Sequence, residues 1–441
     1  MHKYAMNSAA DFMPVDRLRN IQNQKFLKRF RYTYDNVKWY RDLLAKNGVD
    51  PNSIRSIDDI VKLPFIVKTD LRDTYPTGML ATSMENIVRF HASSGTTGKP
   101  IVVPYTREDL DVWSECVARC LTMFGIDETD VLQVGYGYGL FTGGLGLHDG
   151  GERRGCAVVP ASGGNTARHL MFIRDLGVSA IACTPSYFLH VIDHAQKIGY
   201  DWKETKLRVG IFGAEPWTDG MRQFIEQETG IVAHDIYGLT EVSGPGVGGD
   251  CSCHAGIHIM EDHFYPEIID PETLKPVPDG EEGELVFTTL DKTGMPLIRY
   301  RTRDITRIIP DQCACGRTIR RIGRISHRSD DMMIVRGVNV FPGQIESVLT
   351  GIDTGLVNYQ VHLDTNDSGL ATIEVKFEAT PEMYVTFTSE PEKRDLLAKV
   401  VSERLRQTVG IGFKATVVDQ GGIPRSEGKM QRIVDHRKID L

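Results

Sequence analysis

The sequence has no run of apolar residues long enough to span a bilayer, which takes about 18 or more, so we expect no membrane segment. The first residues, Met1-His2-Lys3-Tyr4, lead into mixed polar sequence without the apolar core of a signal peptide. A basic excess is also missing, since 51 Lys and Arg stand against 59 Asp and Glu, a formal net charge of −8. A general nucleic-acid binder usually carries such an excess, so this class is disfavoured.

Cysteine is scarce. Eight cysteines in 441 residues are too few for a disulfide scaffold. Two close pairs, Cys251/Cys253 and Cys313/Cys315, are instead typical of metal ligands in a reducing compartment. We therefore expect a cytoplasmic protein.

The chain is long enough for two or more domains with sizeable cores, and its 41% hydrophobic and 25% charged residues are ordinary for globular proteins. Residues 16–46 have helical spacing, with Asp16 as a possible cap and Gly48 as a possible end. The many basic residues of this segment are interpreted as a solvated helix face.

Apolar runs alternate with helical patterns between residues 90 and 240, which predicts βαβ units on a mostly parallel sheet. Ligands of such sheets bind at the carboxyl ends of the strands. The predicted strands are Val131–Val134, Cys156–Pro160, Ala180–Cys183, Val209–Phe212 and Val232–Ile236. The predicted helices are Arg168–Leu176, Ser186–Lys197 and Thr218–Thr229.

From about residue 256 to 325, short alternating runs with Pro and Gly turns predict a small, mostly antiparallel sheet or barrel. The remaining pattern predicts a small α+β domain with strands at 333–335, 358–363, 372–378 and 414–418 and helices at 342–349 and 393–409. The expected class is α/β: an amino-terminal domain over 1–329 that includes the β-rich part, and a carboxy-terminal domain over 330–441.

The segment His91-Ala-Ser-Ser-Gly-Thr-Thr-Gly-Lys-Pro100 combines small residues, hydroxyls and a lysine. Backbone N–H groups of such a loop can surround phosphate oxygens, and Ser94, Thr96, Thr97 and Lys99 add side-chain donors. The spacing from Gly95 to Lys99 is too short for a Walker A loop. From composition alone, a plain Gly/Ser turn is an equally good interpretation.

Ser93-Ser-Gly-Thr-Thr-Gly98 resembles the phosphate-binding signature of the adenylate-forming superfamily, which includes acyl-CoA synthetases and luciferases. More narrowly, nearly the whole chain resembles phenylacetate–CoA ligases. The narrower resemblance rests on Tyr136–Gly146, Ser162–Thr166, Thr184–Tyr187, Phe212–Trp217, Glu261–Phe264 and Val335–Pro342, which follow the family's order.

The resemblance implies an ATP site. Tyr237 would stack on adenine, Thr240 would reach the α-phosphate, Asp304 would hold the ribose hydroxyls, and Glu241 would be a hard oxygen ligand for Mg²⁺. The full set of implied ATP or AMP contacts is Ser93, Ser94, Gly95, Thr96, Thr97, Gly98, Lys99, Gly213, Ala214, Glu215, Pro216, Asp235, Ile236, Tyr237, Gly238, Thr240, Asp304 and Arg328.

Ile423–Met430 resembles the motif that carries the superfamily's adenylation lysine, here Lys429. A cation is needed there because a substrate carboxylate must approach an α-phosphate while charge builds on phosphorus. The resemblance also implies a hinge at Asp330, about which the small domain would rotate between two half-reactions, with Gly337 near the pantetheine path. This chain departs from the common pattern by Arg303 and His327, each where many relatives have Gly.

The Gly- and Tyr-rich stretch from Tyr136 to Gly146 predicts flat pocket walls that suit an aryl ring. The acyl-pocket candidates are Tyr136, Phe141, Ala214, Ile236 and Pro245, although each is equally compatible with an ordinary core position. Gly244-Pro-Gly-Val-Gly-Gly249 formally matches a dinucleotide-binding pattern. No helix pattern follows it and Pro stands at its second position, so we interpret this match as false.

Two Cys/His clusters about 60 residues apart could supply four tetrahedral ligands of a structural zinc ion. Related sequences carry Cys and His at the spacing of Cys251 and His258, so we select these two with Cys313 and Cys315. Cys253 and His254 remain alternatives in the first cluster, and unligated surface thiols remain the metal-free interpretation.

The sequence thus predicts ATP-dependent, AMP-forming ligation of an aryl carboxylic acid, phenylacetate or a close analogue, to coenzyme A. The predicted catalytic residues are Lys429, Glu241 and Thr240. The predicted cofactors are ATP, CoA and Mg²⁺, and we also expect a structural Zn²⁺. The resemblance further implies a homodimer. We expect no nucleic-acid or membrane partner. A carrier-protein thiol as acceptor is the alternative, and a non-catalytic nucleotide-binding zinc scaffold is a third hypothesis.

Overall fold

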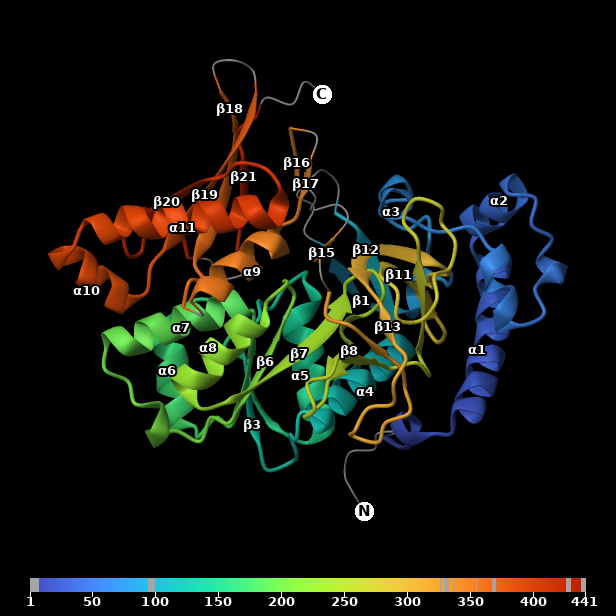
Figure 1. Ribbon diagram of the computed structural model, residues 1–441. Helices are drawn as coiled ribbons and strands as arrows, with labels where there is room; N and C mark the ends of the chain where they lie inside the picture. The colour runs from blue at the N-terminus through green and yellow to red at the C-terminus, as the bar shows by residue number, and fades with distance from the viewer. Residues whose placement is uncertain are drawn as a thin grey trace.

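The computed structural model describes residues 8–93, 100–325, 327–328, 333–336, 338–353, 355–366, 370–425 and 430–437. Its largest element is a nine-stranded sheet with the strand order β13-β14-β9-β8-β7-β6-β5-β3-β4. In Figure 1 this sheet crosses the centre of the molecule, with α1 at one side and the carboxy-terminal segment above the other. The architecture is mixed α/β, as predicted.

Five neighbouring strands of the large sheet are parallel. They are β3 (Val131–Val134), β4 (Ala157–Val159), β5 (Ala180–Cys183), β6 (Val209–Gly213) and β7 (Val232–Leu239). The helices that connect them are α5 (Thr142–Arg154), α6 (Thr166–Asp175), α7 (Pro185–Lys197) and α8 (Asp219–Thr229). Side chains at the helix starts accept backbone N–H bonds, such as Thr184 from Tyr187 and Thr218 from Met221. The predicted βαβ alternation is confirmed.

After β7 the sheet becomes antiparallel through β8 (Gly244–Asp250), β9 (Ile257–Ile259), β14 (Arg321–Ile322) and β13 (Ile308–Ile309). Strand β8 is rich in glycine because helix α4 (Arg107–Met123) lies directly against it. A Cβ on Gly244 would be 2.5 Å from Trp113, and one on Gly246 would be 2.7 Å from Val117. The Gly244–Gly249 stretch is therefore a close-packed strand, which confirms that the dinucleotide pattern was a false match.

The β-rich segment divides between two sheets. Strands β10 (Phe264–Ile269), β11 (Gly283–Thr289), β12 (Tyr300–Thr306) and β15 (His327–Arg328) form a four-stranded antiparallel sheet. The short strands β9, β13 and β14 pair with the large sheet instead. His327, one of the two departures from the pattern that the resemblance implies, lies in an extended strand opposite Ile305, a backbone conformation that any residue adopts.

The amino-terminal segment forms α1 (Val15–Asn36), α2 (Lys38–Lys46) and α3 (Lys68–Asp73), so the predicted helical run of residues 16–46 is interrupted at Val37. Strands β1 (Ile87–Ala92) and β2 (Val102–Thr106) pair as an antiparallel hairpin. This hairpin brackets the predicted phosphate loop, of which Ser94 to Lys99 lie outside the described residues.

The carboxy-terminal segment has its own sheet, in the order β20-β19-β18-β21, and a separate hairpin of β16 and β17. Three of its elements were not predicted, namely β17, α10 and β21. The bounds are β16 (Met333–Val335), β17 (Val338–Val340), α9 (Pro342–Ile352), β18 (Tyr359–Thr365), β19 (Ala371–Glu378), α10 (Pro381–Ser389), α11 (Glu392–Val409), β20 (Lys414–Val418) and β21 (Ile433–Asp435).

A buried ionic network joins the amino terminus to the loops around β10. Arg119 is fully buried, and its guanidinium pairs with Asp11 at 2.5 Å and Asp262 at 2.9 Å. The neighbouring His263 forms ion pairs with Asp262 and Asp291, at 3.1 and 2.6 Å. His263 and Arg119 hold the pKa of Asp262 well below its usual range, despite the opposing effect of burial. The loop that follows β11 is thereby fixed at Asp291.

Among the described residues, every helix is too short or too polar to cross a lipid bilayer.

Candidate active site

Several of the predicted nucleotide-site residues lie where the parallel strands of the large sheet end. The β1–β2 hairpin reaches this edge, since the N–H of Ala92 donates to the carbonyl of Leu140 at 2.8 Å, just before α5. Ser93 closes the base of the phosphate loop by bonding Ile101, through its N–H at 3.0 Å and its hydroxyl oxygen at 3.3 Å. The loop therefore starts and returns next to the carboxyl ends of the strands.

The loop after β6 turns tightly against β7. A Cβ on Gly213 would lie 2.2 Å from the carbonyl oxygen of Ile236, and Ala214 has a φ of 70°. Glu215 accepts a hydrogen bond from the N–H of Ser186 at 2.8 Å, in the first turn of α7. Pro216 is exposed. Gly213 is thus required by close backbone packing, and its loop can approach a flat ring.

Tyr237 and Arg328 both contact the carboxylate of Asp304. The Tyr237 hydroxyl donates to Asp304 at 2.6 Å, and Arg328 contacts the other oxygen of Asp304 at 3.2 Å. Burial and the nearby Asp304 raise the pKa of Tyr237 well above its usual value, so the hydroxyl keeps its proton. These three side chains come from β7, β12 and β15. The predicted ribose-binding group is therefore assembled from both sheets.

Asp235 lies on β7 inside the sheet rather than at its open edge. Its carboxylate is 3.9 Å from the guanidinium of Arg324. Burial raises the pKa of Asp235 to about 6, and Arg324 acts against this increase. Gly238 is in the same strand, where a Cβ would lie 1.8 Å from the carbonyl oxygen of Gly244. Asp235 and Gly238 thus belong to the packing of β7, the strand that carries Tyr237.

The four-residue turn between β7 and β8 carries Thr240 and Glu241. The Thr240 hydroxyl is 3.3 Å from that of Thr142, at the start of α5. Glu241 is buried, and its carboxylate lies 3.8 Å from the ammonium of Lys68. The ammonium of Lys292 contacts main-chain carbonyls of this turn. Burial lowers the pKa of Lys292 to about 8, although the negative charges of Asp109 and Glu241 act to raise it. Sequence reasoning missed both lysines because neither belongs to a recognised motif.

The acyl-pocket candidates lie beside the loops after β3, β6 and β7. Tyr136 is buried, and its hydroxyl donates to the carbonyls of Cys183 at 2.7 Å and Gly213 at 3.3 Å. Ile236 is buried next to Gly213, and Pro245 packs opposite Gly238. Phe141 differs, since it is 54% exposed at the start of α5.

The carboxy-terminal segment contacts this edge of the sheet directly. Glu215 accepts a hydrogen bond from the N–H of Met430 at 3.3 Å. A Cβ on Gly220, in α8, would lie 2.7 Å from Thr350 of α9, and Figure 1 shows α9 above α8. Lys429 and Asp330, the predicted adenylation lysine and the predicted hinge, lie outside the described residues. The neighbouring Met430 nevertheless contacts the loop after β6.

A second cluster, away from the strand ends, brings together the four selected metal-ligand candidates. The sulfur atoms of Cys251 and Cys313 are 3.6 Å apart, and the sulfur of Cys315 is 3.4 Å from Nε2 of His258. All four ligand atoms lie within 4.8 Å of one another. Cys253 is exposed instead, and His254 bonds Asp250 at 2.9 Å.

Two family models match the chain: "AMP-binding enzyme" over residues 23–290 and "AMP-binding enzyme C-terminal domain" over residues 337–437. The phenylacetate-coenzyme A ligase of Escherichia coli (strain K12) is 48% identical and covers 96% of both chains. Those of Aromatoleum evansii and Thermus thermophilus are 46% and 43% identical over at least 97% of each chain. This chain belongs to the phenylacetate–CoA ligase family of AMP-binding enzymes.

Solved structures agree with this placement in the AMP-binding family. A 2-hydroxyisobutyryl-CoA ligase in the postadenylation state, in complex with 2-HIB-AMP, has a TM-score of 0.89 at 25% identity, over 97% of this chain and 91% of that one. The same ligase in the thioesterification state has a TM-score of 0.71. As a whole, our structure is therefore more similar to the postadenylation state.

Arg303, the departure next to Asp304, occupies a left-handed backbone conformation with a φ of 70°. Glycine adopts this conformation freely, whereas other residues pay a strain energy of about 1–2 kcal/mol. In this chain Arg303 gains an ion pair with Glu284 at 3.6 Å.

We predict that Arg303→Gly is more stable than Arg303→Ala by about 1 kcal/mol. Both variants lose the guanidinium, and only glycine relieves the backbone strain. Urea unfolding of the two purified variants measures the difference. An alanine variant that is equally or more stable would show that the backbone at Arg303 is unstrained.

Proposed function

We propose that this protein joins phenylacetate, or a close aryl acid, to coenzyme A through an acyl-adenylate. The observation that carries the proposal is the convergence of Tyr237, Asp304, Thr240 and Glu241 at the carboxyl ends of the parallel strands. The full-length similarity to phenylacetate–CoA ligases supports the choice of acid and of acceptor.

In the first half-reaction, a carboxylate oxygen of the acid attacks the α-phosphorus of ATP, and pyrophosphate leaves. Asp304 accepts hydrogen bonds from the ribose hydroxyls, and the Thr240 hydroxyl donates to the α-phosphate. The Lys429 ammonium stabilises the charge that builds between the two anions. The turn after β6, with Ala214 and Ile236, bounds the adenine and the acyl group.

Magnesium, when bound with ATP, neutralises charge on the phosphates, and Glu241 is the carboxylate of this chain that fits it. Its oxygen is 3.8 Å from Lys68, which is longer than a hydrogen bond, and a buried carboxylate is the hard donor that Mg²⁺ prefers. In the second half-reaction the CoA thiolate attacks the acyl carbonyl carbon, and AMP leaves. The proposed rotation about Asp330 removes Lys429 and opens the thiol path.

A carrier-protein thiol is the alternative acceptor. One relative named as a fatty acid–[acyl-carrier-protein] ligase, from Streptomyces coeruleorubidus, is 26% identical over 59% of this chain. Phenylacetate–CoA ligases match far more of the chain at higher identity, which favours CoA. Assays with free CoA and with a pantetheinylated carrier separate the two acceptors.

Lys429→Ala is expected to lower phenylacetate-dependent ATP–pyrophosphate exchange by about 100- to 1,000-fold, because the charge at the α-phosphorus loses its cation. Lys393→Ala is the matched control, since Lys393 is an exposed lysine of the same segment that forms a local ion pair with Glu390. Unchanged exchange in Lys429→Ala would refute the role of this lysine. Exchange with no aryl acid in the wild type would refute the function itself.

We also propose a structural zinc ion at Cys251, His258, Cys313 and Cys315. Metal–sulfur bonds of about 2.3 Å at tetrahedral angles place ligand atoms about 3.5–3.8 Å apart, close to the 3.4 and 3.6 Å distances in the structure. The second nitrogen of His258 lies 3.3 Å from the carbonyl of Ile319, which suits the outer hydrogen bond of a metal-bound histidine. The ion has no role in the adenylation step.

Metal analysis of the purified protein should therefore find about one zinc per chain. Cys313→Ser should lose the metal and melt at a lower temperature. Cys253→Ser, which changes the exposed cysteine, should keep the zinc content and the melting temperature of the wild type. Equal zinc content in the two variants would contradict this ligand set.

The homodimer and the cytoplasmic location stay predictions. Sedimentation analysis of the purified protein tests the homodimer.

A further inference from the structure

In the turn between β7 and β8, residues 240–243, the main-chain carbonyls have partners outside the turn. Its two later N–H groups, of Val242 and Ser243, both donate to the carbonyl of Leu239, at 3.2 and 3.1 Å. All four of its carbonyl oxygens instead face two buried side-chain donors outside the turn. Because this turn carries Thr240 and Glu241, whatever holds its backbone also sets the direction of those two side chains.

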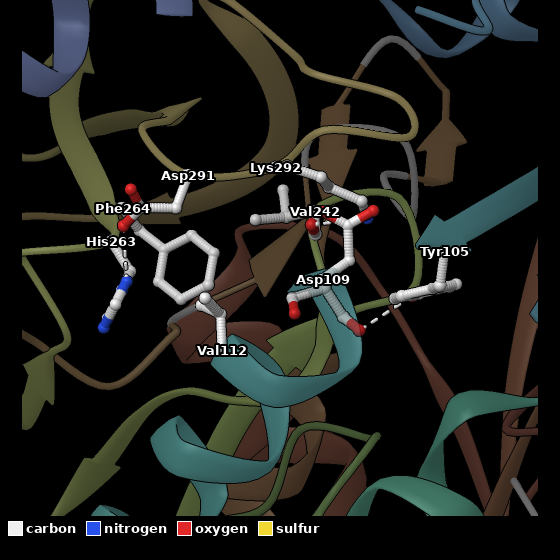
Figure 2. Close-up of a pocket in the computed structure, with 9 residues that line it drawn as sticks. Tyr105, Asp109, Val112, Val242, His263, Phe264, Asp291 and Lys292 are labelled. Carbon is white, nitrogen blue, oxygen red and sulfur yellow. Dashed lines mark hydrogen bonds and ion pairs between the residues drawn. The ribbon is translucent and has the colours of Figure 1, made fainter. Parts of the chain in front are cut away.

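The first donor is the hydroxyl of Tyr105, which lies 2.8 Å from the carbonyl of Ser243 and 3.4 Å from that of Thr240. The second is the ammonium of Lys292, 2.8 Å from the carbonyl of Val242 and 3.5 Å from that of Glu241. The ammonium also lies 4.4 Å from the centre of the Tyr105 ring, a cation–π contact. Figure 2 shows Lys292 extending past Val242 on the side where Tyr105 lies.

The residues before and after Lys292 in the chain are fixed by ion pairs and hydrogen bonds. Asp291 bonds His263 and Lys25, at 2.6 and 2.5 Å. On the other side, Asp109 accepts hydrogen bonds from the N–H groups of Thr293 at 2.6 Å and Gly294 at 2.9 Å. The lysine thus projects from a fixed loop of the β-rich segment into the large sheet.

A buried ammonium is costly unless its surroundings replace water. Here the replacement consists of carbonyl oxygens and an aromatic face, which are the groups that coordinate a free monovalent cation. The carboxylates of Asp109 and Glu241 supply nearby negative charge. The environment of Lys292 therefore resembles a monovalent-cation site in which the ion is attached to the chain.

We propose that Lys292 is a positioning residue for adenylation: its ammonium acts as a tethered monovalent cation that, with Tyr105, fixes the turn presenting Thr240 and Glu241 to Mg·ATP. The proposal rests on the function proposed above. Lys292 touches neither substrate nor reacting atoms, and it acts through the backbone of residues 240–243. Loss of the ammonium frees the turn while leaving the motif residues unchanged.

Three variants test the proposal. Lys292→Met keeps the apolar stem and removes the charge, Lys292→Ala also leaves room for a small cation, and Tyr105→Phe removes the other donor. Lys275→Ala, an exposed lysine of the same β-rich segment, is the control. Each variant is assayed for phenylacetate-dependent pyrophosphate exchange over a range of Mg²⁺ and ATP concentrations. Each is also assayed for thioester formation from synthetic phenylacetyl-adenylate and CoA.

Lys292→Met should slow exchange at saturating ATP by about 100-fold and raise the Mg²⁺ concentration needed for half-maximal rate, since small displacements of catalytic groups have effects of this size. Thioester formation needs no Mg·ATP and should fall much less. Ammonium chloride should restore exchange in Lys292→Ala at least about 10-fold, whereas tetramethylammonium at the same ionic strength should not. Tyr105→Phe should show a smaller loss of the same kind.

Normal exchange in Lys292→Met would overturn the proposal. So would an equal loss in both half-reactions without rescue by ammonium, because that pattern describes general destabilisation. If the wild type exchanges pyrophosphate with no aryl acid, the proposed function fails, and calorimetric binding of Mg·ATP then tests Lys292 separately. Weaker binding in Lys292→Ala that ammonium restores supports the tethered cation, and binding equal to wild type refutes it.

Discussion

The change from parallel to antiparallel pairing between β7 and β8 is the constraint on which the site depends. Up to β7, each strand delivers its carboxyl end to one edge of the sheet, and a helix returns the chain to the other edge. At β8 the chain reverses in a four-residue turn instead, so Thr240 and Glu241 stay at that edge. The reversal requires glycine, because β7 and β8 approach so closely that a Cβ at Gly238 would collide with the carbonyl of Gly244.

Buried charges join the rest of the molecule to this edge. Arg119 connects the amino-terminal Asp11 to Asp262, and His263 continues the network to Asp291. The residue after Asp291 is Lys292, whose ammonium reaches the turn after β7. Breaking a buried ion pair leaves an uncompensated charge, so such networks tolerate few alternative arrangements. Through Lys292 they hold the loop after β11 against the turn that carries Thr240 and Glu241.

Much of this arrangement was predictable from the sequence. The alternation of apolar runs with helical patterns predicted the parallel strands, and the Tyr237 and Asp304 motifs predicted groups that the structure does bring together. The glycines from Tyr136 to Gly146 were interpreted as flat pocket walls. The structure gives at least some of them a packing role, since a Cβ on Gly146 would lie 2.3 Å from Trp113. Lys68 and Lys292 could not be found, because single lysines without a motif carry no spatial information. Strand β21 could not be predicted either, because it is short and pairs with a strand some 70 residues away.

The central claim is that the acid becomes joined to AMP before it meets CoA. Phenylacetate labelled with ¹⁸O in both carboxylate oxygens tests this most directly, with mass spectrometry of the AMP released in a complete reaction with ATP and CoA. The account predicts one labelled oxygen in each AMP and none in pyrophosphate. Unlabelled AMP, or formation of ADP and phosphate in its place, would contradict it.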